Sequence, residues 1–160
     1  MQIKDRVFIV TGASSGIGLA TATALSDRHA QVALFARSTD ALQKLGRQLP
    51  GSLPVTVDVT QFDRVREAVG AVYRHYGRID GLVNNAGRSY AASVEEIDPA
   101  LFDEIFHLNV LGPIVAMQSV IPLMRVQGGG SIVNIKFGDC VHDHSSIQRL
   151  LVFEACASWL

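Results

Sequence analysis

Three glycines, Gly12, Gly16 and Gly18, stand between two segments of contrasting pattern. The apolar run 7–10 before them predicts a buried strand, and the small-residue segment 17–28 after them predicts a helix. Glycines let the backbone approach a phosphate closely, and a helix N-terminus offers free N–H groups and a partial positive charge. The spacing Gly-x-x-x-Gly-x-Gly differs from the Gly-x-Gly-x-x-Gly fingerprint, yet it indicates an anion-binding loop. A tight turn with close helix packing is the alternative interpretation.

The segments around this loop alternate between strand and helix patterns. Strands are predicted at 7–10, 31–35, 53–57, 79–83 and 131–135, and helices at 17–28, 39–48, 62–76 and 99–124, the last bent near Gly112-Pro113. This alternation predicts an α/β fold with a doubly wound parallel sheet of Rossmann type, helices on both faces and strand order 3-2-1-4-5. The site is then expected where the order reverses, at the carboxyl ends of the first and fourth strands.

Composition narrows the class of protein. The 160 residues are 48% hydrophobic and 18% charged, which is typical of a single globular domain. The net charge of -1 shows no basic excess, so no nucleic-acid partner is expected. The longest apolar stretches are strand-length and interrupted, and the N-terminus lacks a signal-peptide pattern, so we expect no membrane span and a cytoplasmic protein. Cys140 and Cys156 lack metal-type spacing and are expected to be free thiols.

Five motifs carry a family resemblance. They are Thr11–Gly18 (TGASSGIG), Asp58–Thr60 (DVT), Asn84–Gly87 (NNAG), Asn109–Val110 (NV) and Gly130–Ile135 (GSIVNI). In this order and spacing they resemble the short-chain dehydrogenase/reductase family, over residues 4 to about 135. The resemblance implies an oxidoreductase that transfers a hydride between a nicotinamide cofactor and a carbonyl or alcohol carbon of a small molecule. Intact members of the family are often homo-oligomers, assembled partly through the long helix that follows Pro99 and the helix that carries the family's catalytic tyrosine. This sequence retains only the first, so a homo-oligomer is one alternative for it.

The resemblance implies cofactor contacts at the matched positions. In chain order these are Gly12, Ser14, Ser15, Gly16, Ile17, Gly18, Asp58, Val59, Asn85, Ala86 and Gly87. The glycine loop would wrap the pyrophosphate, and Asp58 would accept a hydrogen bond from the adenine amino group. The segment from Asn85 would line the pocket beside the cofactor, and Asn109 would help to hold a water near a catalytic lysine. Without the family pattern, Asp58 as a turn cap and Asn85 as a turn residue are the ordinary interpretations.

Arg37 bears on which nicotinamide cofactor is used. It follows the second predicted strand, where enzymes of this fold that use NAD tend to carry an acidic residue for the ribose hydroxyls. No acid is present in Phe35-Ala36-Arg37-Ser38, and a guanidinium pairs well with the 2′-phosphate. The sequence therefore favours NADP, with NAD as the alternative. Ser15 stands where many NADP-preferring relatives carry a second basic residue, and Arg37 as a solvated surface charge is the other interpretation.

The resemblance fails after Ile135. The family places a catalytic serine after the fifth strand and then a Tyr-x-x-x-Lys pair, in which the tyrosine is the general acid/base. This sequence contains no Tyr-x-x-x-Lys, and its tyrosines, Tyr73, Tyr76 and Tyr90, all come earlier. We therefore divide the chain into a nucleotide-binding domain, 1–135, and an aberrant tail, 136–160, part of which is compatible with a helix. The sequence also lacks the final strands of the family, so the chain as written is expected to be catalytically inactive.

A shift of the reading frame by one base explains the tail. The codons AAG TTC for Lys136-Phe137 contain AGT, a serine codon, and CTA CTC for Leu150-Leu151 contain TAC, a tyrosine codon. GAA GCG for Glu154-Ala155 contain AAG, a lysine codon. With permitted codons throughout, the shifted tail reads SSGTAFMTIPQYSAYSSSKRALVG, which supplies the serine and a Tyr-x-x-x-Lys. Each single match is weak, because third bases are free, whereas the joint match favours out-of-frame translation of residues 136–160.

Two other hypotheses belong to different classes of protein. One is a non-catalytic nucleotide-binding or regulatory module, which would use the glycine loop without chemistry. The other is a metal-dependent enzyme built on the tail, where His142 and His144 lie beside Asp139 and Asp143. Two histidines and two carboxylates so close together are far more often a polar loop, so we expect no metal site.

Overall fold

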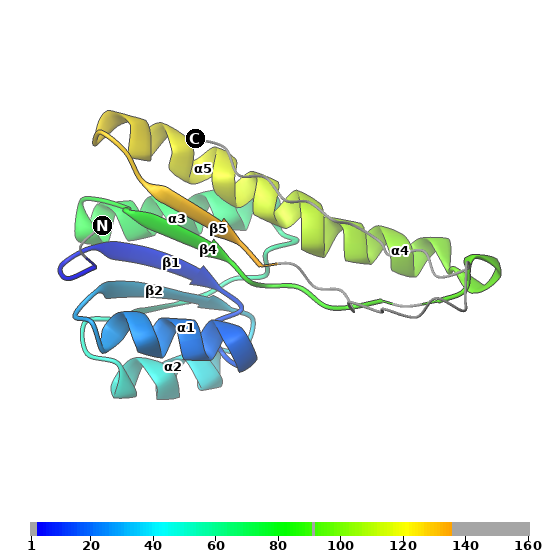
Figure 1. Ribbon diagram of the computed structural model, residues 1–160, viewed down its shortest axis with the longest axis horizontal. Helices are drawn as coiled ribbons and strands as arrows, with labels where there is room; N and C mark the ends of the chain where they lie inside the picture. Colours follow the sequence, from blue (N-terminus) through cyan, green and yellow to red (C-terminus); the bar gives the residue numbers. More distant parts are fainter. Residues whose placement is uncertain (1–2, 91, 136–160) are drawn as a thin grey trace, which may run out of the picture.

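The computed structural model describes residues 3–90 and 92–135 and shows strands and helices in alternation (Figure 1). The elements are β1 (Val7–Thr11), α1 (Gly16–Ser26), β2 (Gln31–Ala36), α2 (Thr39–Gln48), β3 (Leu53–Thr56), α3 (Phe62–Tyr76), β4 (Gly81–Asn84), the 3₁₀ turn η1 (Val94–Glu96), α4 (Pro99–Phe106), the π-helical turn η2 (His107–Leu111), α5 (Gly112–Val126) and β5 (Ser131–Asn134).

The five strands form one parallel sheet in the order β3-β2-β1-β4-β5. Helices α1 and α2 cover one face of the sheet, and α3 and α5 cover the other (Figure 1). The order reverses at β1, whose neighbours are β2 on one side and β4 on the other. This confirms the predicted strand order, and it brings the carboxyl ends of β1 and β4 together.

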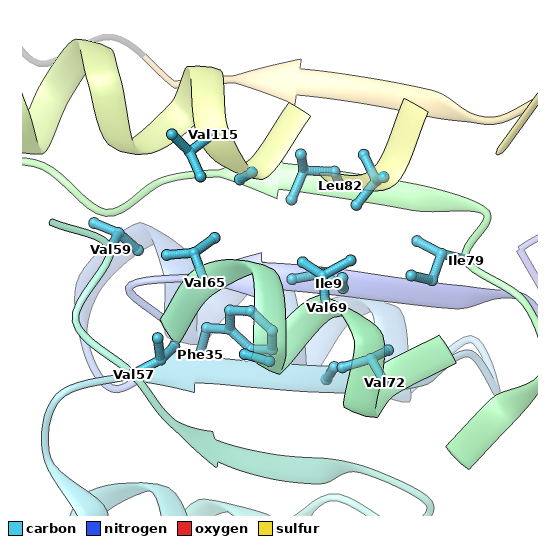
Figure 2. Packing of buried hydrophobic residues seen from close by; sticks show 14 of the residues in the cluster. Ile9, Phe35, Val57, Val59, Val65, Val69, Val72, Ile79, Leu82 and Val115 are labelled. Atoms are coloured by element: carbon cyan, nitrogen blue, oxygen red, sulfur yellow. The ribbon is translucent and has the colours of Figure 1, made fainter. Parts of the chain in front are cut away.

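Strand β1 is buried on both faces, which explains why its sequence is a continuous apolar run. Alternate residues point to opposite sides: Val7 and Ile9 pack toward α3 and α5, whereas Phe8 and Val10 pack toward α1 and α2. On the α3 side, Val65, Val69 and Val72 pack against strand residues (Figure 2). Further core residues drawn in Figure 2 are Ile9, Phe35, Val57, Val59, Ile79, Leu82 and Val115.

Local signals set the ends of the helices well. Helices α2 and α3 have the bounds that the sequence predicts, and Leu42, Leu45 and Leu49 are buried at their helical spacing. Gly77 ends α3 in the left-handed conformation with φ 74°, where a glycine is the least strained residue. The strand bounds differ from the predicted ones by one or two residues. The 3₁₀ turn η1 was not predicted.

The helical region after Pro99 departs from regularity at His107–Leu111, directly before the predicted bend at Gly112-Pro113. Gly112 N–H donates to the His107 carbonyl five residues earlier, which is a π-type bond. Pro113 has no N–H to donate to the Asn109 carbonyl, its normal α-helical partner. The π-helical turn thus lies where the proline removes a helical donor.

The same region, Pro99–Val126, is long and apolar enough to span a membrane by length and composition, with 28 residues and a mean hydropathy of 1.4. Within the described chain, 28% of its most apolar window is buried. Val115, Ala116, Val120 and Met124 belong to the buried core beside α3. These residues form the face of α5 that packs against the α3 side of the core, and the expectation of no membrane span stays a prediction.

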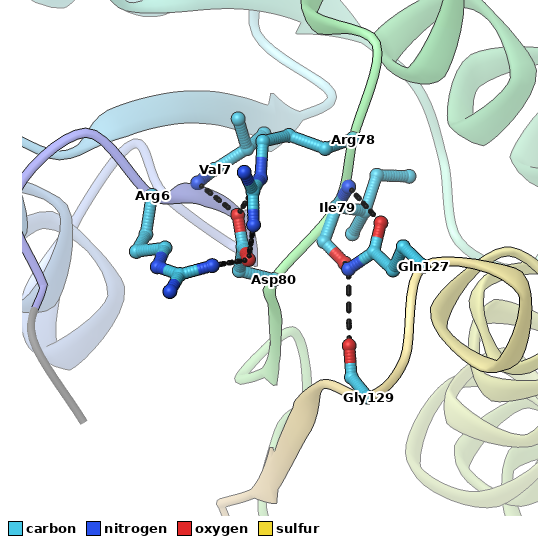
Figure 3. A network of polar contacts seen from close by, with 7 residues as sticks. All are labelled: Arg6, Val7, Arg78, Ile79, Asp80, Gln127 and Gly129. Carbon is cyan, nitrogen blue, oxygen red and sulfur yellow. Dashed lines mark hydrogen bonds and ion pairs between the residues drawn. The ribbon is translucent and has the colours of Figure 1, made fainter.

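A buried carboxylate, that of Asp80, ties the amino ends of β1 and β4 together (Figure 3). Its Oδ1 accepts from Arg6 Nη1 at 2.9 Å and from Arg78 Nη2 at 2.6 Å. Its Oδ2 accepts from Arg78 Nε at 2.7 Å and from the Val7 N–H at 3.0 Å. Burial would raise the pKa of Asp80, but the hydrogen bonds from Arg78, Val7 and Arg6 outweigh it and hold that pKa below its ordinary value.

The Gln127 side chain closes the same end of the sheet (Figure 3). Its Oε1 accepts from the Ile79 N–H at 3.1 Å, and its Nε2 donates to the Ile79 carbonyl at 2.6 Å and to the Gly129 carbonyl at 3.0 Å. The side-chain amide of Gln127 thus satisfies both backbone groups of Ile79, as a neighbouring strand would, and it fixes the turn that leads into β5. This leaves the opposite end of the sheet for the site.

Candidate functional site

The glycine loop lies directly on the chain that follows β4. Gly12 has φ 67°, and a Cβ built on it would come 2.8 Å from Asn85 Nδ2 and 3.0 Å from Ala86 Cα. A Cβ on Gly18 would collide with the Gly12 carbonyl and with Asn85 Nδ2. Gly16 differs, because nothing lies within 4 Å of its Cβ position and only its φ of 54° favours glycine. Two of the glycines therefore allow close packing, and one permits the turn.

Hydrogen bonds hold this loop in place. Thr11 Oγ1 accepts from the N–H groups of Asn85 and Ala86, both at 2.9 Å, and donates to the Val83 carbonyl at 3.4 Å. Asn85 Nδ2 donates to the Thr11 carbonyl at 3.0 Å. Asn85 Oδ1 is buried and has no hydrogen-bond partner among the described residues. The loops after β1 and β4 therefore form one rigid unit that carries one unused acceptor.

The N-terminus of α1 is open to an anion. Ser15, its N-cap residue, makes no side-chain capping bond, and the first turn contains no acidic residue. The first N–H groups of the helix and its partial positive charge are therefore available to a ligand. Ile17, in this first turn, is 57% exposed beside the loop.

Asp58 stands at the adjacent edge of the sheet, after β3. Its Oδ1 accepts from the Thr60 N–H at 2.9 Å and from Thr60 Oγ1 at 2.8 Å. These bonds fix the carboxylate and leave Oδ2 without a bond from Thr60. The turn-cap interpretation is thus correct for one oxygen, and the other oxygen is available to a ligand.

The predicted residues gather around one cavity of about 720 Å³, a volume typical of cofactor sites. Those that line it are Gly12, Ser14, Ser15, Gly16, Ile17, Arg37, Asp58, Val59, Asn85, Ala86 and Gly87. Gly18 lies beneath the loop rather than in the wall. Asn109 is also outside the wall, because its side chain is bonded to the backbone of Arg88: Oδ1 accepts from N–H at 3.1 Å and Nδ2 donates to the carbonyl at 2.8 Å.

Arg37 lies in the wall of the cavity after β2 and makes no ion pair within residues 3–90 and 92–135. No carboxylate occupies the two positions on either side of it in the sequence. Its charge is therefore free to pair with an anionic ligand. The alternative of a solvated surface charge remains compatible with this placement.

The sequence did not indicate the wall opposite the glycine loop. That wall is formed by Arg88, Asp103, Glu104, His107 and Leu108. Arg88 Nη2 donates to Glu104 Oε2 at 3.4 Å, and both residues line the cavity. Local sequence carries no signal for this wall, because its location depends on how α5, which continues from α4 and η2, packs beside α3.

The tail hypotheses concern residues 136–160, which lie outside the described residues, as do Cys140, Cys156, His142 and His144. Among the residues that the structure describes, no group of three or more His, Cys, Asp or Glu side chains could hold a metal ion.

Comparisons with known proteins agree with this geometry. Residues 6–142 match the family model described as short chain dehydrogenase. The chain is 37% identical over 137 residues to an uncharacterized oxidoreductase of Staphylococcus saprophyticus, covering 84% of this chain and 55% of that protein. It is 37% identical over 139 residues to the 3-oxoacyl-[acyl-carrier-protein] reductase FabG of Thermotoga maritima, covering 84% of this chain and 56% of that one.

A solved structure shows the same fold. The crystal structure of a short-chain dehydrogenase from Streptomyces avermitilis matches with a TM-score of 0.77 and 38% sequence identity, over 81% of this chain and 48% of that chain. The chain spans about half the length of the relatives it matches.

Proposed function

The chain belongs to the short-chain dehydrogenase family, and we propose that its cavity binds a nicotinamide dinucleotide as the cofactor half of an oxidoreductase. The observation that carries the proposal is the convergence of the glycine loop, Asp58 and the Asn85 segment on one cavity. The substrate class that we propose for the whole protein is a small carbonyl or alcohol compound. The cofactor would supply or accept the hydride when bound.

The residues present fit such a dinucleotide. A Cβ would not fit at Gly12 or Gly18, and the open N-terminus of α1 suits a pyrophosphate. The free oxygen of Asp58 suits the adenine amino group, and the Asn85–Gly87 segment would border the ribose and the nicotinamide side. Asn85 Oδ1 is a buried acceptor of the site without a partner among the described residues. Asn109, which is hydrogen-bonded to the Arg88 backbone, would hold the segment after Gly87 at the border of the cavity.

We further propose that the cofactor is NADP. The support is Arg37, which lies in the cavity wall without an ion-pair partner among the described residues. A charge-assisted hydrogen bond contributes about 1.5–3 kcal/mol, so Arg37→Ser should weaken NADPH binding roughly 10- to 100-fold and leave NADH binding nearly unchanged. The control is Arg47→Ser, on the exposed side of α2.

Titration of nicotinamide fluorescence with each protein measures both affinities. Equal affinity of the wild-type chain for NADPH and NADH would disprove the NADP preference alone. Failure to bind either dinucleotide would disprove the proposed function itself.

We propose that the chain as written has negligible NADPH-dependent carbonyl reduction, because it lacks the family's serine and Tyr-x-x-x-Lys. An out-of-frame tail over residues 136–160 is the proposed cause. The support is the joint match of the shifted frame to the family's serine and Tyr-x-x-x-Lys, and the family model does not extend over residues 143–160.

Sequencing the coding DNA from codon 136 tests the frame. The expected result is a base order that encodes SSGTAFMTIPQYSAYSSSKRALVG one base out of frame. Codons that cannot give this motif would refute the frame shift. A protein expressed from the corrected frame should gain carbonyl reductase activity, and comparable activity in the chain as written would refute its inactivity.

A non-catalytic nucleotide-binding or regulatory module is the second candidate function. It is favoured by one observation: the described residues that line the cavity all lie before position 109. Its distinguishing result would be tight, specific NADPH binding by a stable protein that has no reductase activity in either frame.

A further inference from the structure

His107 is a cavity residue that the sequence did not single out. It stands in the π-helical turn η2 and lines the cavity together with Asp58, Val59 and Gln61. Its ring is stacked on Phe62, with centroids 5.9 Å apart and planes 7° from parallel. Phe62 begins α3, directly after the Asp58 turn. The imidazole is therefore fixed at the Asp58 end of the cavity.

The hydrogen bonds of His107 define its tautomer. Nδ1 lies 2.8 Å from the Asp103 backbone carbonyl, which can only accept, so Nδ1 carries a hydrogen. The Asp103 carboxylate, 3.4 Å from the same nitrogen, favours that assignment. In the neutral imidazole, Nε2 then has a lone pair, and no hydrogen-bond partner is found for it within the described chain. His107 thus offers an unused acceptor at the cavity wall.

An adenine amino group has two hydrogens and needs two acceptors. Asp58 supplies one free oxygen, because Thr60 occupies the other. We propose that His107 Nε2 is the second acceptor for this amino group and makes the site selective for adenine over a 6-oxo purine. The inference rests on the proposed dinucleotide site and adds a specificity residue to it.

The experiment compares NADPH with its hypoxanthine counterpart, in which an oxygen replaces the adenine amino group. Both dissociation constants are measured by nicotinamide fluorescence on wild type and on His107→Phe, which keeps an aromatic ring against Phe62 but removes both ring nitrogens. The matched control is His75→Phe, on an exposed histidine of α3 outside the cavity wall. The ratio of the two constants on one sample does not depend on the fraction folded.

A hydrogen bond of ordinary net strength changes an affinity about three- to tenfold. His107→Phe should lower the preference for the amino form by that factor, and His75→Phe should leave it unchanged. An unchanged ratio in His107→Phe, or an equal loss for both ligands, would overturn the inference while leaving the dinucleotide site intact. If wild type binds neither dinucleotide, both the proposed function and this inference fail.

Discussion

Ser15→Asp separates the stability of helix α1 from its capacity to bind an anion. Ser15 is the N-cap of α1 and makes no side-chain capping bond. Aspartate is as good an N-cap residue as serine, and a negative charge at a helix N-terminus contributes about 0.3–1 kcal/mol of stabilisation. The variant should therefore melt at the same temperature as the wild type or slightly above it.

The same charge should weaken dinucleotide binding. Ser15 lines the cavity at the place where the pyrophosphate is expected. Two like charges about 4 Å apart repel by about 4 kcal/mol at an effective dielectric constant of 20, and salt and side-chain rotation reduce this figure. We therefore expect NADPH affinity to fall by at least about tenfold.

The assay pairs a thermal melt with an NADPH titration on each protein. Ser93→Asp is the control, since Ser93 is also an N-cap residue, of the short turn η1, and does not line the cavity. Retention of wild-type NADPH affinity in Ser15→Asp would refute the placement of the pyrophosphate at α1. A loss of both stability and binding would show that the cap argument is wrong.

Three further results are expected. Gly18→Ala should destabilise the chain by about 1–3 kcal/mol in urea unfolding and weaken NADPH binding, because the added Cβ would collide with backbone atoms. An effect no larger than that of Gly70→Ala on α3 would contradict this. Stability should decrease as the pH falls below the ordinary carboxyl range, because the pKa of Asp80 is lowered in the folded chain, and Asp80→Asn should flatten this acid limb of the melting curve. Ile9→Ala, in the fully buried centre of β1, should cost about 2–5 kcal/mol without changing the ratio of NADPH to NADH affinity.

The sequence predicts the fold well where an element is determined by residues that are close together in the chain. The apolar run of β1, the Leu42 face of α2 and the Gly77 stop of α3 each act within a few residues, so their signals survive in the sequence. The glycine loop and Asp58 follow strands whose order the alternation already predicts, so their approach to one cavity could be anticipated.

Long-range packing explains the features that were missed. His107 lies in the turn η2 directly before α5, so its place at the cavity depends on how α5 packs beside α3, which no local pattern encodes. The Thr11 hydroxyl is another case: it serves residues more than seventy positions away, and its spacing to Asn85 has no meaning until β1 and β4 pair. Contacts of this kind have to be found in the structure.

The arrangement of the site along the chain has a functional consequence. Every residue proposed to bind the dinucleotide follows one of the first four strands or belongs to the helices before β5, and we predict that these residues form the cavity without the tail. The family's serine, tyrosine and lysine would come after β5, whose end is tied to β4 by the Ile135 N–H to Asn84 carbonyl bond of 2.8 Å. A frame change after residue 135 would therefore remove the chemistry and leave binding intact. NADPH binding without turnover is the result expected for the chain as written, and loss of both together would show that the cavity itself depends on the tail.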